Sequence, residues 1–471
     1  MGKAHFGMIG LGTMGRNFLL NIAEHGIQGV GFDLDATKRD LLLKEGTGMA
    51  VDVGSDLADF LAKLESPRNI MMLVPAGPIV DAVITDLVPH LDHDDLIIDG
   101  GNSHFTDTDR RAADLSKKGV GFMGVGVSGG EEGARHGASI MPGGRRDFYD
   151  RIEKTLQAVS AKVDGEPCVA YMGSGSAGHF VKMVHNGIEY GLMQILAETY
   201  DFMQRVLNMD HAAMSDAFAE WNSRELNSFL VEITAEVLRK TDPETGNPLV
   251  SMILDTAGQK GTGKWTSQAA MDFGIPIPTI DSAVSMRQIS SQKSTRGVIA
   301  AKYKDSVSKG NSNAPAKASL DDLRRALFCA FIVTYAQGMS LLQAASKEKD
   351  YGLDLSQTAK IWRGGCIIRS ALLEEIRAAY STDASLPNLI MDDKFAAILS
   401  EDLGQFRSVI GAFVADGIPS LCFSSALAYF EAFRTERLPA NLIQGQRDFF
   451  GAHTYQRIDK EGTFHTSDWN V

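Results

Sequence analysis

The segment Gly10-Leu11-Gly12-Thr13-Met14-Gly15 decides the fold of the first part of this chain. It fits the pattern G-x-G-x-x-G, follows a strand-like apolar run and opens a helix-like run. The first glycine permits a tight turn, the second lets the backbone approach a pyrophosphate, and the third allows close packing of helix on strand. Backbone amides at the start of that helix face the phosphates. The six residues therefore predict a Rossmann-like site that binds a dinucleotide cofactor.

Strand-like and helix-like runs alternate around this segment and beyond it. The predicted strands are His5–Ile9, Gly29–Phe32, Asn69–Val74, Asp95–Ile98, Val120–Val125 and Cys168–Met172. The predicted helices between them include Met14–His25, Thr108–Lys118 and Arg146–Ser160. Such alternation is typical of a parallel sheet with helices on both faces. We therefore expect an α/β Rossmann-like N-terminal domain.

The pattern changes at the small-residue stretch Gly173–Gly178, after which nearly every segment to about Leu438 is helix-like. The polar stretch Ser306–Ala318 predicts a loop. The residues after Pro439 have little periodicity and predict an extended tail. We therefore expect a dinucleotide-binding domain over residues 1–177, a large all-α substrate and dimerisation domain over residues 178–438, and a tail over residues 439–471.

Length and composition limit the classes of protein that this chain can represent. A single core stops growing at roughly 250–300 residues, so 471 residues predict at least two domains. The net charge of −13 argues against nucleic acid or an anionic membrane as partner. No apolar run approaches the roughly 20 residues of a membrane span, and the N-terminus carries no signal-like region. We expect a cytoplasmic protein with four buried thiols, without a metal site.

Asp33 bears on the choice of nicotinamide cofactor. It ends the second predicted strand, 18 positions after Gly15. A carboxylate at this position accepts hydrogen bonds from the adenosine ribose and repels an added 2′-phosphate. Lys38 and Arg39 lie slightly further on and leave NADP as the alternative, although such a pair is more often solvated. The residues predict a preference for NAD.

The segment Phe180–Tyr190 carries the most specific chemistry. Lys182, His185, Asn186 and Glu189 follow at i, i+3, i+4 and i+7, which places them on one helical stripe. The solvated face of an ordinary amphipathic helix also carries Lys and Glu. Four such groups close to a glycine-rich junction nevertheless favour a catalytic site.

This stripe suits the oxidation and decarboxylation of a sugar acid. A desolvated lysine has a lowered pKa and can accept the proton of the hydroxyl that is oxidised. After protonation, Lys182 can donate to the enolate oxygen that develops as CO2 leaves. A carboxylic acid two turns along the helix, at Glu189, can then protonate carbon. The helical rise between the two residues is about 10 Å, enough to span a sugar acid.

Six blocks of the chain resemble the family of decarboxylating 6-phosphogluconate dehydrogenases, in order and along nearly the whole length. The blocks are Ile98–Ser103, Gly126–Arg135, Lys182–Tyr190, Ala257–Trp265, Ile361–Ser370 and Gln446–Tyr455. The resemblance implies an enzyme of the pentose phosphate pathway and of gluconate utilization. It would oxidise 6-phosphogluconate to ribulose 5-phosphate and CO2 while reducing NAD(P).

The resemblance also implies a role for each matching residue. Lys182 would be the general base and Glu189 the acid that protonates the enediol. The substrate's carboxylate and hydroxyls would be held by Asn102, Ser128, Gly129, Gly130, His185 and Asn186. The 6-phosphate would be held by Tyr190, Lys260, Thr262, Arg287 and Arg447. Arg447 and His453 would belong to a tail that enters the active site of the other subunit of a homodimer, with further pairing of dimers left open. Val74 and Asn102 would lie at the cofactor.

Two departures from the family and two alternatives frame this interpretation. Asp33-Leu34-Asp35 stands where members that use NADP commonly carry Asn-Arg-Thr, and Pro75 replaces a usual lysine. Pro75 supplies neither a charge nor a backbone donor. One alternative is a β-hydroxyacid dehydrogenase that acts on a smaller acid without decarboxylation, but it leaves Glu189 and the phosphate cations unexplained. The other is a non-catalytic dinucleotide-binding scaffold, which would not need Lys182.

Overall fold

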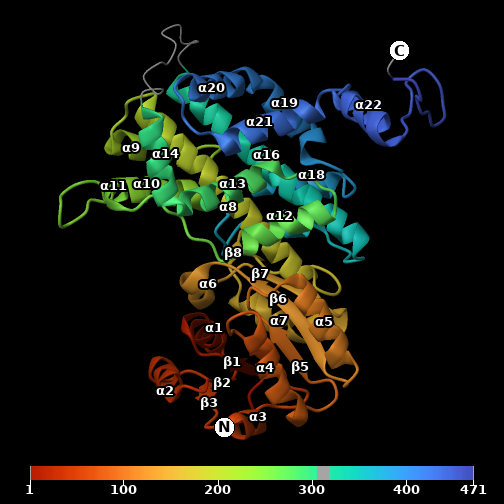
Figure 1. The fold of residues 1–471 in the computed structure, drawn as a ribbon. Coiled ribbons are helices and arrows are strands. Elements are labelled where there is room, and N and C mark those ends of the chain that lie inside the picture. The colour runs from red at the N-terminus through yellow and green to blue at the C-terminus, as the bar shows by residue number, and fades with distance from the viewer. Residues whose placement is uncertain (1, 305–317, 470–471) are drawn as a thin grey trace.

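The computed structural model describes residues 2–304 and 318–469. Figure 1 shows an α/β domain at the N-terminal end and a larger helical domain above it. A C-terminal helix and its following segment project to one side of the helical domain. The fold class predicted from the sequence is confirmed. Residues 306–317 of the predicted loop Ser306–Ala318 lie outside the described residues.

The α/β domain is built on one seven-stranded sheet with the order β3-β2-β1-β4-β5-β6-β7. Every neighbouring pair is parallel except β6 and β7, which are antiparallel. The chain reverses its direction of travel across the sheet between β1 and β4, and ligands bind at such switch points. The strands are β1 (Phe6–Ile9), β2 (Gly29–Phe32), β3 (Val51–Val53), β4 (Asn69–Met72), β5 (Leu96–Asp99), β6 (Gly121–Val127) and β7 (Ile140–Gly144).

Helices cover both faces of this sheet, as the alternation of elements predicted. Buried apolar side chains form two separate clusters, one under α1 and α7 and the other under α3, α4 and α5. The helices are α1 (Thr13–Glu24), α2 (Ala36–Glu45), α3 (Leu57–Ala62), α4 (Pro78–Leu87), α5 (Phe105–Ser116), α6 (Gly130–His136) and α7 (Arg146–Val159). Five of the six predicted strands are present, with ends that differ by at most two residues.

The sixth predicted strand, Cys168–Met172, is wrong. This segment runs beside the edge strand β7 and forms only isolated bridges, such as Ile140 with Val169. Backbone hydrogen bonds join it to β7 in both directions: Ile140 N donates to Cys168 O at 2.9 Å, and Met172 N donates to Pro142 O at 2.8 Å. Its apolar side chains are buried at the junction between the two domains, which explains the strand-like pattern without a continuous ladder. A short hairpin of β8 (Lys162–Val163) and β9 (Glu166–Pro167) precedes it.

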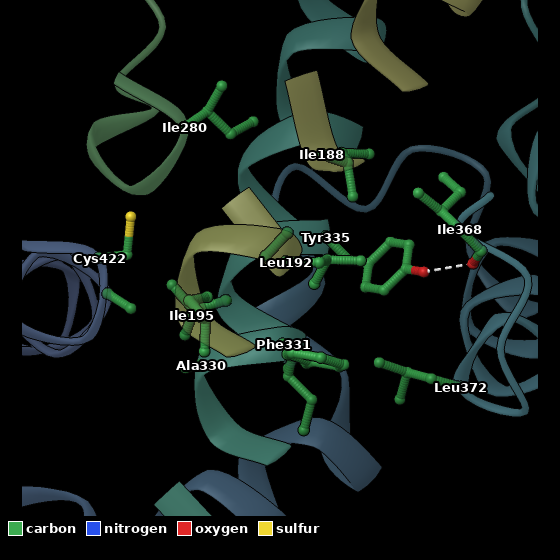
Figure 2. Packing of buried hydrophobic residues seen from close by; sticks show 14 of the residues in the cluster. Ile188, Leu192, Ile195, Ile280, Ala330, Phe331, Tyr335, Ile368, Leu372 and Cys422 are labelled. Atoms are coloured by element: carbon green, nitrogen blue, oxygen red, sulfur yellow. Dashed lines mark hydrogen bonds between the residues drawn. The ribbon is translucent and has the colours of Figure 1, made fainter. Parts of the chain in front are cut away.

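Two helices of 29 residues form the centre of the helical domain, α8 (Ala177–Arg205) and α16 (Leu320–Glu348). They approach closely because glycines lie between them: a Cβ on Gly338 would come within 2.5 Å of Ile188. Figure 2 shows Ile188, Leu192 and Ile195 of α8 against Phe331 and Tyr335 of α16. The Tyr335 hydroxyl donates to Ile368 O at 2.8 Å, which satisfies the polar end of a fully buried ring.

Shorter helices surround this central pair. They are α9 (His211–Asn222), α10 (Phe229–Arg239), α11 (Leu249–Met252), α12 (Thr262–Asp272), α13 (Pro278–Ser291), α14 (Lys293–Lys302), α17 (Leu355–Trp362), α18 (Leu372–Thr382), α19 (Asp393–Glu401), α20 (Leu403–Ala415) and α21 (Leu421–Phe433). All four cysteines lie in the described part of the chain, and each is buried and free, as predicted.

Helix α16 is long and apolar enough to cross a membrane, contrary to the expectation that no run approaches that length. Its most apolar window is 83% buried inside the protein. Because other helices already cover that surface, we interpret α16 as the core helix of its domain.

The sequence predicted an extended tail after Pro439, but part of this tail is helical. Ala440–Gly451 form the helix α22, and Tyr455 then pairs with Phe464 in an antiparallel bridge. The periodicity that reveals a helix comes from a buried apolar stripe. Leu442 and Ile443 are instead 65% and 60% exposed, so this helix has no such stripe within its own chain.

Candidate active site

Two adjoining hollows lie at the carboxyl ends of the sheet strands. The first is a cleft of about 1200 Å³ between the sheet and the helices α8, α12 and α13. The second is a pocket of about 950 Å³ beside the glycine-rich turn. Met14, Leu73, Val74 and Pro75 line both hollows, so a ligand in the pocket can extend into the cleft.

The glycine-rich turn has the geometry that a pyrophosphate requires. Gly10 has a φ of +89°, and a Cβ on Gly15 would come within 1.9 Å of Gly10 O. Gly12 is the N-cap of α1, and a Cβ there would meet no atom within 4 Å. The backbone amides at the start of α1 therefore face open space in which phosphate oxygens fit. Gly10, Gly12, Thr13 and Met14 line the pocket, whereas Leu11 and Gly15 are buried behind it.

Asp33 follows β2 and lines the same pocket. Its Oδ2 accepts a hydrogen bond from Leu11 N at 2.8 Å, so the carboxylate is tied to the glycine-rich turn. Lys38 Nζ lies 3.4 Å from the same oxygen, and Arg39 donates to the carbonyl oxygen of Asp33. Both neighbouring cations therefore already have partners at Asp33.

Lys182 lies in α8 where the helix crosses β6. A Cβ on Gly126 would come within 2.4 Å of Lys182 Cβ, so glycine in β6 makes room for the lysine stem. Lys182 is 7% exposed, and its burial lowers the pKa of its ammonium group. It borders a small cavity together with Asn102 and Thr262, which also line the cleft.

Glu189 lies two turns further along α8 and lines the cleft. Burial raises the pKa of its carboxyl group, while the charges of Lys182 and Arg287 oppose that rise. Burial thus favours the neutral form of both Lys182 and Glu189. The helix face therefore carries near one end an amine whose pKa is lowered and near the other a carboxyl group whose pKa is raised.

His185 and Asn186 connect this helix face to its surroundings. His185 is fully buried; its Nε2 lies 3.4 Å from Ser128 Oγ and its Nδ1 lies 3.0 Å from Asn186 Oδ1. Burial lowers the pKa of His185 well below its usual value, so the imidazole is neutral. Asn186 Nδ2 donates to Thr262 Oγ1 at 3.2 Å. These contacts orient polar groups from the loop after β6, from α8 and from α12 toward one another.

The loop that carries Asn102 is held by buried groups beneath it. Asp99 accepts hydrogen bonds from Ser103 Oγ at 2.6 Å and from Gly101 N at 3.0 Å. His179 of α8 lies with its Nε2 3.0 Å from Asp99 O. Asn102 itself is exposed and lines the cleft. The loop is thus fixed to both domains.

Ser128, Gly129 and Gly130 join β6 to α6 beside this face. Gly129 has a φ of +101°, and a Cβ there would come within 2.6 Å of Gly365 O. The block Ile361–Ser370 therefore packs directly on the loop. Ser128 is buried next to His185, but none of the three residues lines the cleft.

Cationic and aromatic groups gather at the far side of the cleft. The Arg287 guanidinium lies 4.1 Å from the centre of the Tyr190 ring, and Arg287 Nη1 donates to Gly258 O at 2.6 Å. A Cβ on Gly263 would come within 2.5 Å of the same ring, so α12 packs tightly on it. Lys260 is exposed and lines the cleft with Arg287, Tyr190 and Thr262.

The structure also identifies lining residues that the sequence did not single out. Trp265 borders both the cleft and the small cavity at Lys182, and Met193 lies one turn beyond Glu189 on α8. The i+4 spacing from Glu189 could have revealed Met193. Arg447 and His453 are exposed in the tail and do not line the described cleft of their own chain.

Fold and site together define a Rossmann-like dinucleotide-binding protein whose helical domain brings a buried lysine and a half-buried glutamate to the cleft beside the glycine-rich turn. Family models narrow this class. The NAD binding domain of 6-phosphogluconate dehydrogenase matches residues 5–173, and the C-terminal domain of 6-phosphogluconate dehydrogenase matches residues 178–469. The chain belongs to the 6-phosphogluconate dehydrogenase family.

Individual relatives agree over the full length. The NADP(+)-dependent, decarboxylating 6-phosphogluconate dehydrogenase of Bacillus subtilis is 47% identical and covers 100% of both chains. The decarboxylating enzyme of Rattus norvegicus is 46% identical over 100% of this chain and 97% of its own. A solved structure of the Plasmodium falciparum 6-phosphogluconate dehydrogenase has a TM-score of 0.94 and 40% identity, and it covers 98% of this chain and 100% of its own. The resemblance that the six blocks implied is confirmed.

Proposed function

We propose that this protein oxidises and decarboxylates 6-phosphogluconate to ribulose 5-phosphate and CO2, with NAD as hydride acceptor. The observation that carries the proposal is the pair Lys182 and Glu189. The two side chains are on one face of α8, and burial shifts their pKa values in opposite directions, down for the amine and up for the acid. Pairs of titratable groups with such opposed shifts are typical of acid–base catalysis.

Each proton in the reaction has a carrier in this chain. Bound nicotinamide supplies the hydride acceptor. Neutral Lys182 takes the proton of the substrate hydroxyl while the carbon that bears this hydroxyl loses hydride. The resulting β-keto acid loses CO2, and the Lys182 ammonium donates a hydrogen bond to the enolate oxygen that forms. Glu189, as a carboxylic acid, then gives its proton to the enediol carbon.

The remaining polar groups of the cleft suit a phosphorylated sugar acid. Asn102, Ser128, Gly129, Gly130, His185 and Asn186 are proposed to hold the carboxylate and hydroxyls. Lys260, Arg287, Tyr190 and Thr262 are proposed to hold the 6-phosphate, because two cations converge there within a protein of net charge −13. This concentration of positive charge supports a dianionic substrate.

We further propose NAD as the preferred cofactor. The Asp33 carboxylate lines the pocket and is fixed by Leu11 N, so an added 2′-phosphate would approach a fixed negative charge. Gly10–Gly15, Val74 and Asn102 complete the proposed contacts. The Bacillus subtilis relative depends on NADP(+), so membership of the family does not by itself favour NAD. The proposal depends on Asp33. A higher kcat/KM with NADP than with NAD would refute it.

The proposed working unit is a homodimer in the cytoplasm. Residues 1–177 would bind the cofactor, residues 178–438 would bind substrate and partner, and residues 439–471 would reach the partner subunit. Exposed Arg447 and His453 support this arrangement, because Arg447 lies on the helix α22, which projects from the body of its own chain (Figure 1), and His453 lies in the turn that follows this helix.

One assay tests the proposed reaction. The protein is incubated with 6-phosphogluconate and either NAD or NADP, and both reduced nicotinamide and released CO2 are followed. Equal amounts of the two products are expected. Hydride transfer without CO2 would favour a β-hydroxyacid dehydrogenase, and the absence of both products would favour a non-catalytic scaffold.

A further inference from the structure

The side chain of Asp448 is unusual in the projecting tail because its neighbours enclose it completely. It lies in α22 and is 0% exposed, although the residues on both sides, Arg447 and Phe449, are exposed. Four donors from later residues converge on its two oxygens. They are Thr454 N at 2.9 Å, His465 Nδ1 at 2.9 Å, Thr466 N at 3.0 Å and Trp469 Nε1 at 3.1 Å.

These bonds close the tail on itself. Thr454 N binds Oδ1 and brings the turn after α22 back onto the helix, while Thr466 N and Trp469 Nε1 bind Oδ2 and bring the last described segment across it. Burial alone would raise the pKa of Asp448, but the bonds from Thr466, His465, Trp469 and Thr454 lower it to about 2. The carboxylate is therefore charged and central to this small fold.

The turn that Asp448 closes also contains a backbone that requires restraint. Ala452 and Thr454 have φ values of +48° and +62°, a left-handed conformation that is unfavourable for residues other than glycine. His453 lies between them. A backbone of this kind persists only where surrounding contacts enforce it, and the bond from Thr454 N to Asp448 is such a contact.

We propose that Asp448 is a positioning residue for the reaction, which fixes Arg447 and His453 relative to one another before the tail enters the partner subunit. Arg447 directly precedes Asp448 in α22, and His453 lies in the turn that the Asp448 carboxylate binds. Gln444 adds to this order, since it contacts Arg447 Nη1 at 3.0 Å and its amide donates to Thr454 O. Pre-organisation of this kind lowers the entropic cost of forming a shared site. The inference rests on the proposed function, because it assigns the tail to the 6-phosphogluconate site.

The substitution Asp448→Asn tests this proposal. Asparagine keeps the size of the side chain but replaces one acceptor oxygen with a donor, so at least one hydrogen bond to a charged group is lost. We expect kcat/KM for 6-phosphogluconate to fall at least about tenfold, mainly through a higher KM, since one such bond is worth about that factor. Binding of reduced nicotinamide, followed by fluorescence, should not change. Asp459→Asn is the matched control, because Asp459 is an exposed tail carboxylate that pairs only with Arg457 among the described residues.

A mixed dimer separates a defect of the tail from misfolding of the whole Asp448→Asn chain. Asp448→Asn and Lys182→Met chains are co-expressed with different affinity tags, and the mixed dimer is purified. Its Asp448→Asn chain has an intact Lys182, and the tail of the Lys182→Met chain can complete that site. We expect about half of the wild-type activity per dimer, since one of two equivalent sites is complete. An inactive mixed dimer, or Asp448→Asn chains with wild-type kinetics, would overturn the proposal.

Hydrogen exchange provides a readout that does not depend on activity. Amides in residues 452–466 should exchange faster in Asp448→Asn than in Asp459→Asn. Unchanged protection would overturn the proposal. A wild-type protein that is inactive toward 6-phosphogluconate would instead refute the proposed function, while exchange would still decide whether Asp448 organises the tail.

Discussion

Lys182 is 7% exposed and lies against Gly126 of β6, so few water molecules can stabilise its charge. Burial lowers its pKa, which makes the neutral amine available as a base. The same burial raises the pKa of Glu189. At the scale of single residues, then, one physical cause prepares two different catalytic groups.

Replacement of Lys182 by methionine isolates this effect. Lys182→Met should lower kcat by about 10²–10⁴-fold, the range for loss of a general acid–base group, because methionine fills the buried space but cannot take a proton. Substrate binding should remain measurable by calorimetry. Lys264→Met, at an exposed lysine of α12, is the control. A near-normal kcat in Lys182→Met would exclude Lys182 as the base.

At the scale of elements, the site depends on how closely α8 approaches the sheet. A Cβ on Gly178 would come within 2.3 Å of Gly124 O, and one on Gly126 within 2.4 Å of Lys182 Cβ. Helix and sheet therefore meet through backbone rather than side chains. This contact fixes the position of Lys182 relative to the sheet and to the small cavity that it borders.

The substitution Gly126→Ala should disturb this contact. The added methyl group pushes α8 from β6 and displaces Lys182, so we expect kcat/KM to fall about 100-fold, the effect of an error of about 1 Å in position. Cofactor binding should be nearly unchanged, because Gly126 does not line the pocket. Gly411→Ala on α20 is the control, since a Cβ there meets no atom within 4 Å. Equal activity of the two variants would contradict the argument.

Glu198 joins α8 to the start of α21. Its Oε1 and Oε2 accept hydrogen bonds from Cys422 N and Phe423 N, both at 3.0 Å. Burial raises its pKa from 4.5 to about 7, although the two backbone bonds oppose that rise. The folded state thus binds this proton more tightly than the unfolded state does. The associated stability is present in full below pH 4.5 and is lost as pH rises through about 7.

Glu198→Gln should remove most of this pH dependence. In the wild type, the free energy of unfolding should fall by on the order of 3 kcal/mol from pH about 4.5 to pH about 8, measured by denaturant titration. The variant should show a clearly smaller fall, because glutamine does not ionise. The exposed Glu436→Gln serves as control. Identical pH profiles for wild type and Glu198→Gln would exclude this role.

At the scale of the whole molecule, the tail has few apolar contacts of its own. Leu442, Ile443 and Phe450 of α22 are 65%, 60% and 71% exposed. Figure 1 shows this helix projecting from the helical domain. An exposed apolar surface of this kind favours association with another protein surface. A second copy of the chain is the proposed partner.

Removal of the residues after Pro439 should therefore abolish activity toward 6-phosphogluconate while the rest of the chain stays folded. Arg447 and His453 are lost, and so is the apolar surface proposed to bind the partner. An activity assay measures the loss of turnover, and sedimentation velocity measures the loss of the dimer. Fluorescence of bound reduced nicotinamide reports whether the rest of the chain is still folded. A truncated monomer with full activity would contradict a site shared between subunits.

The sequence predicted those features that depend on neighbouring residues. The G-x-G-x-x-G turn, the alternation of strands and helices, and the stripe from Lys182 to Glu189 are all local patterns, and the structure contains each of them. The predictions from sequence were wrong for Cys168–Met172, which forms no strand, and for α22, which was expected to be extended. In both cases, the apolar pattern reflects contacts with distant or absent surfaces rather than the local backbone.

The sequence by itself determined the alternation of strands and helices, the dinucleotide turn and the family, because spacing along one helix or one turn requires only local geometry. Tertiary structure alone decided that Lys182 is buried and Glu189 half-buried, that Trp265 borders both cavities, and that the Ser128–Gly130 loop packs on Gly365. The pKa shifts follow from that burial. Burial arises only when segments far apart in sequence exclude water from the same place, so no local pattern can specify it.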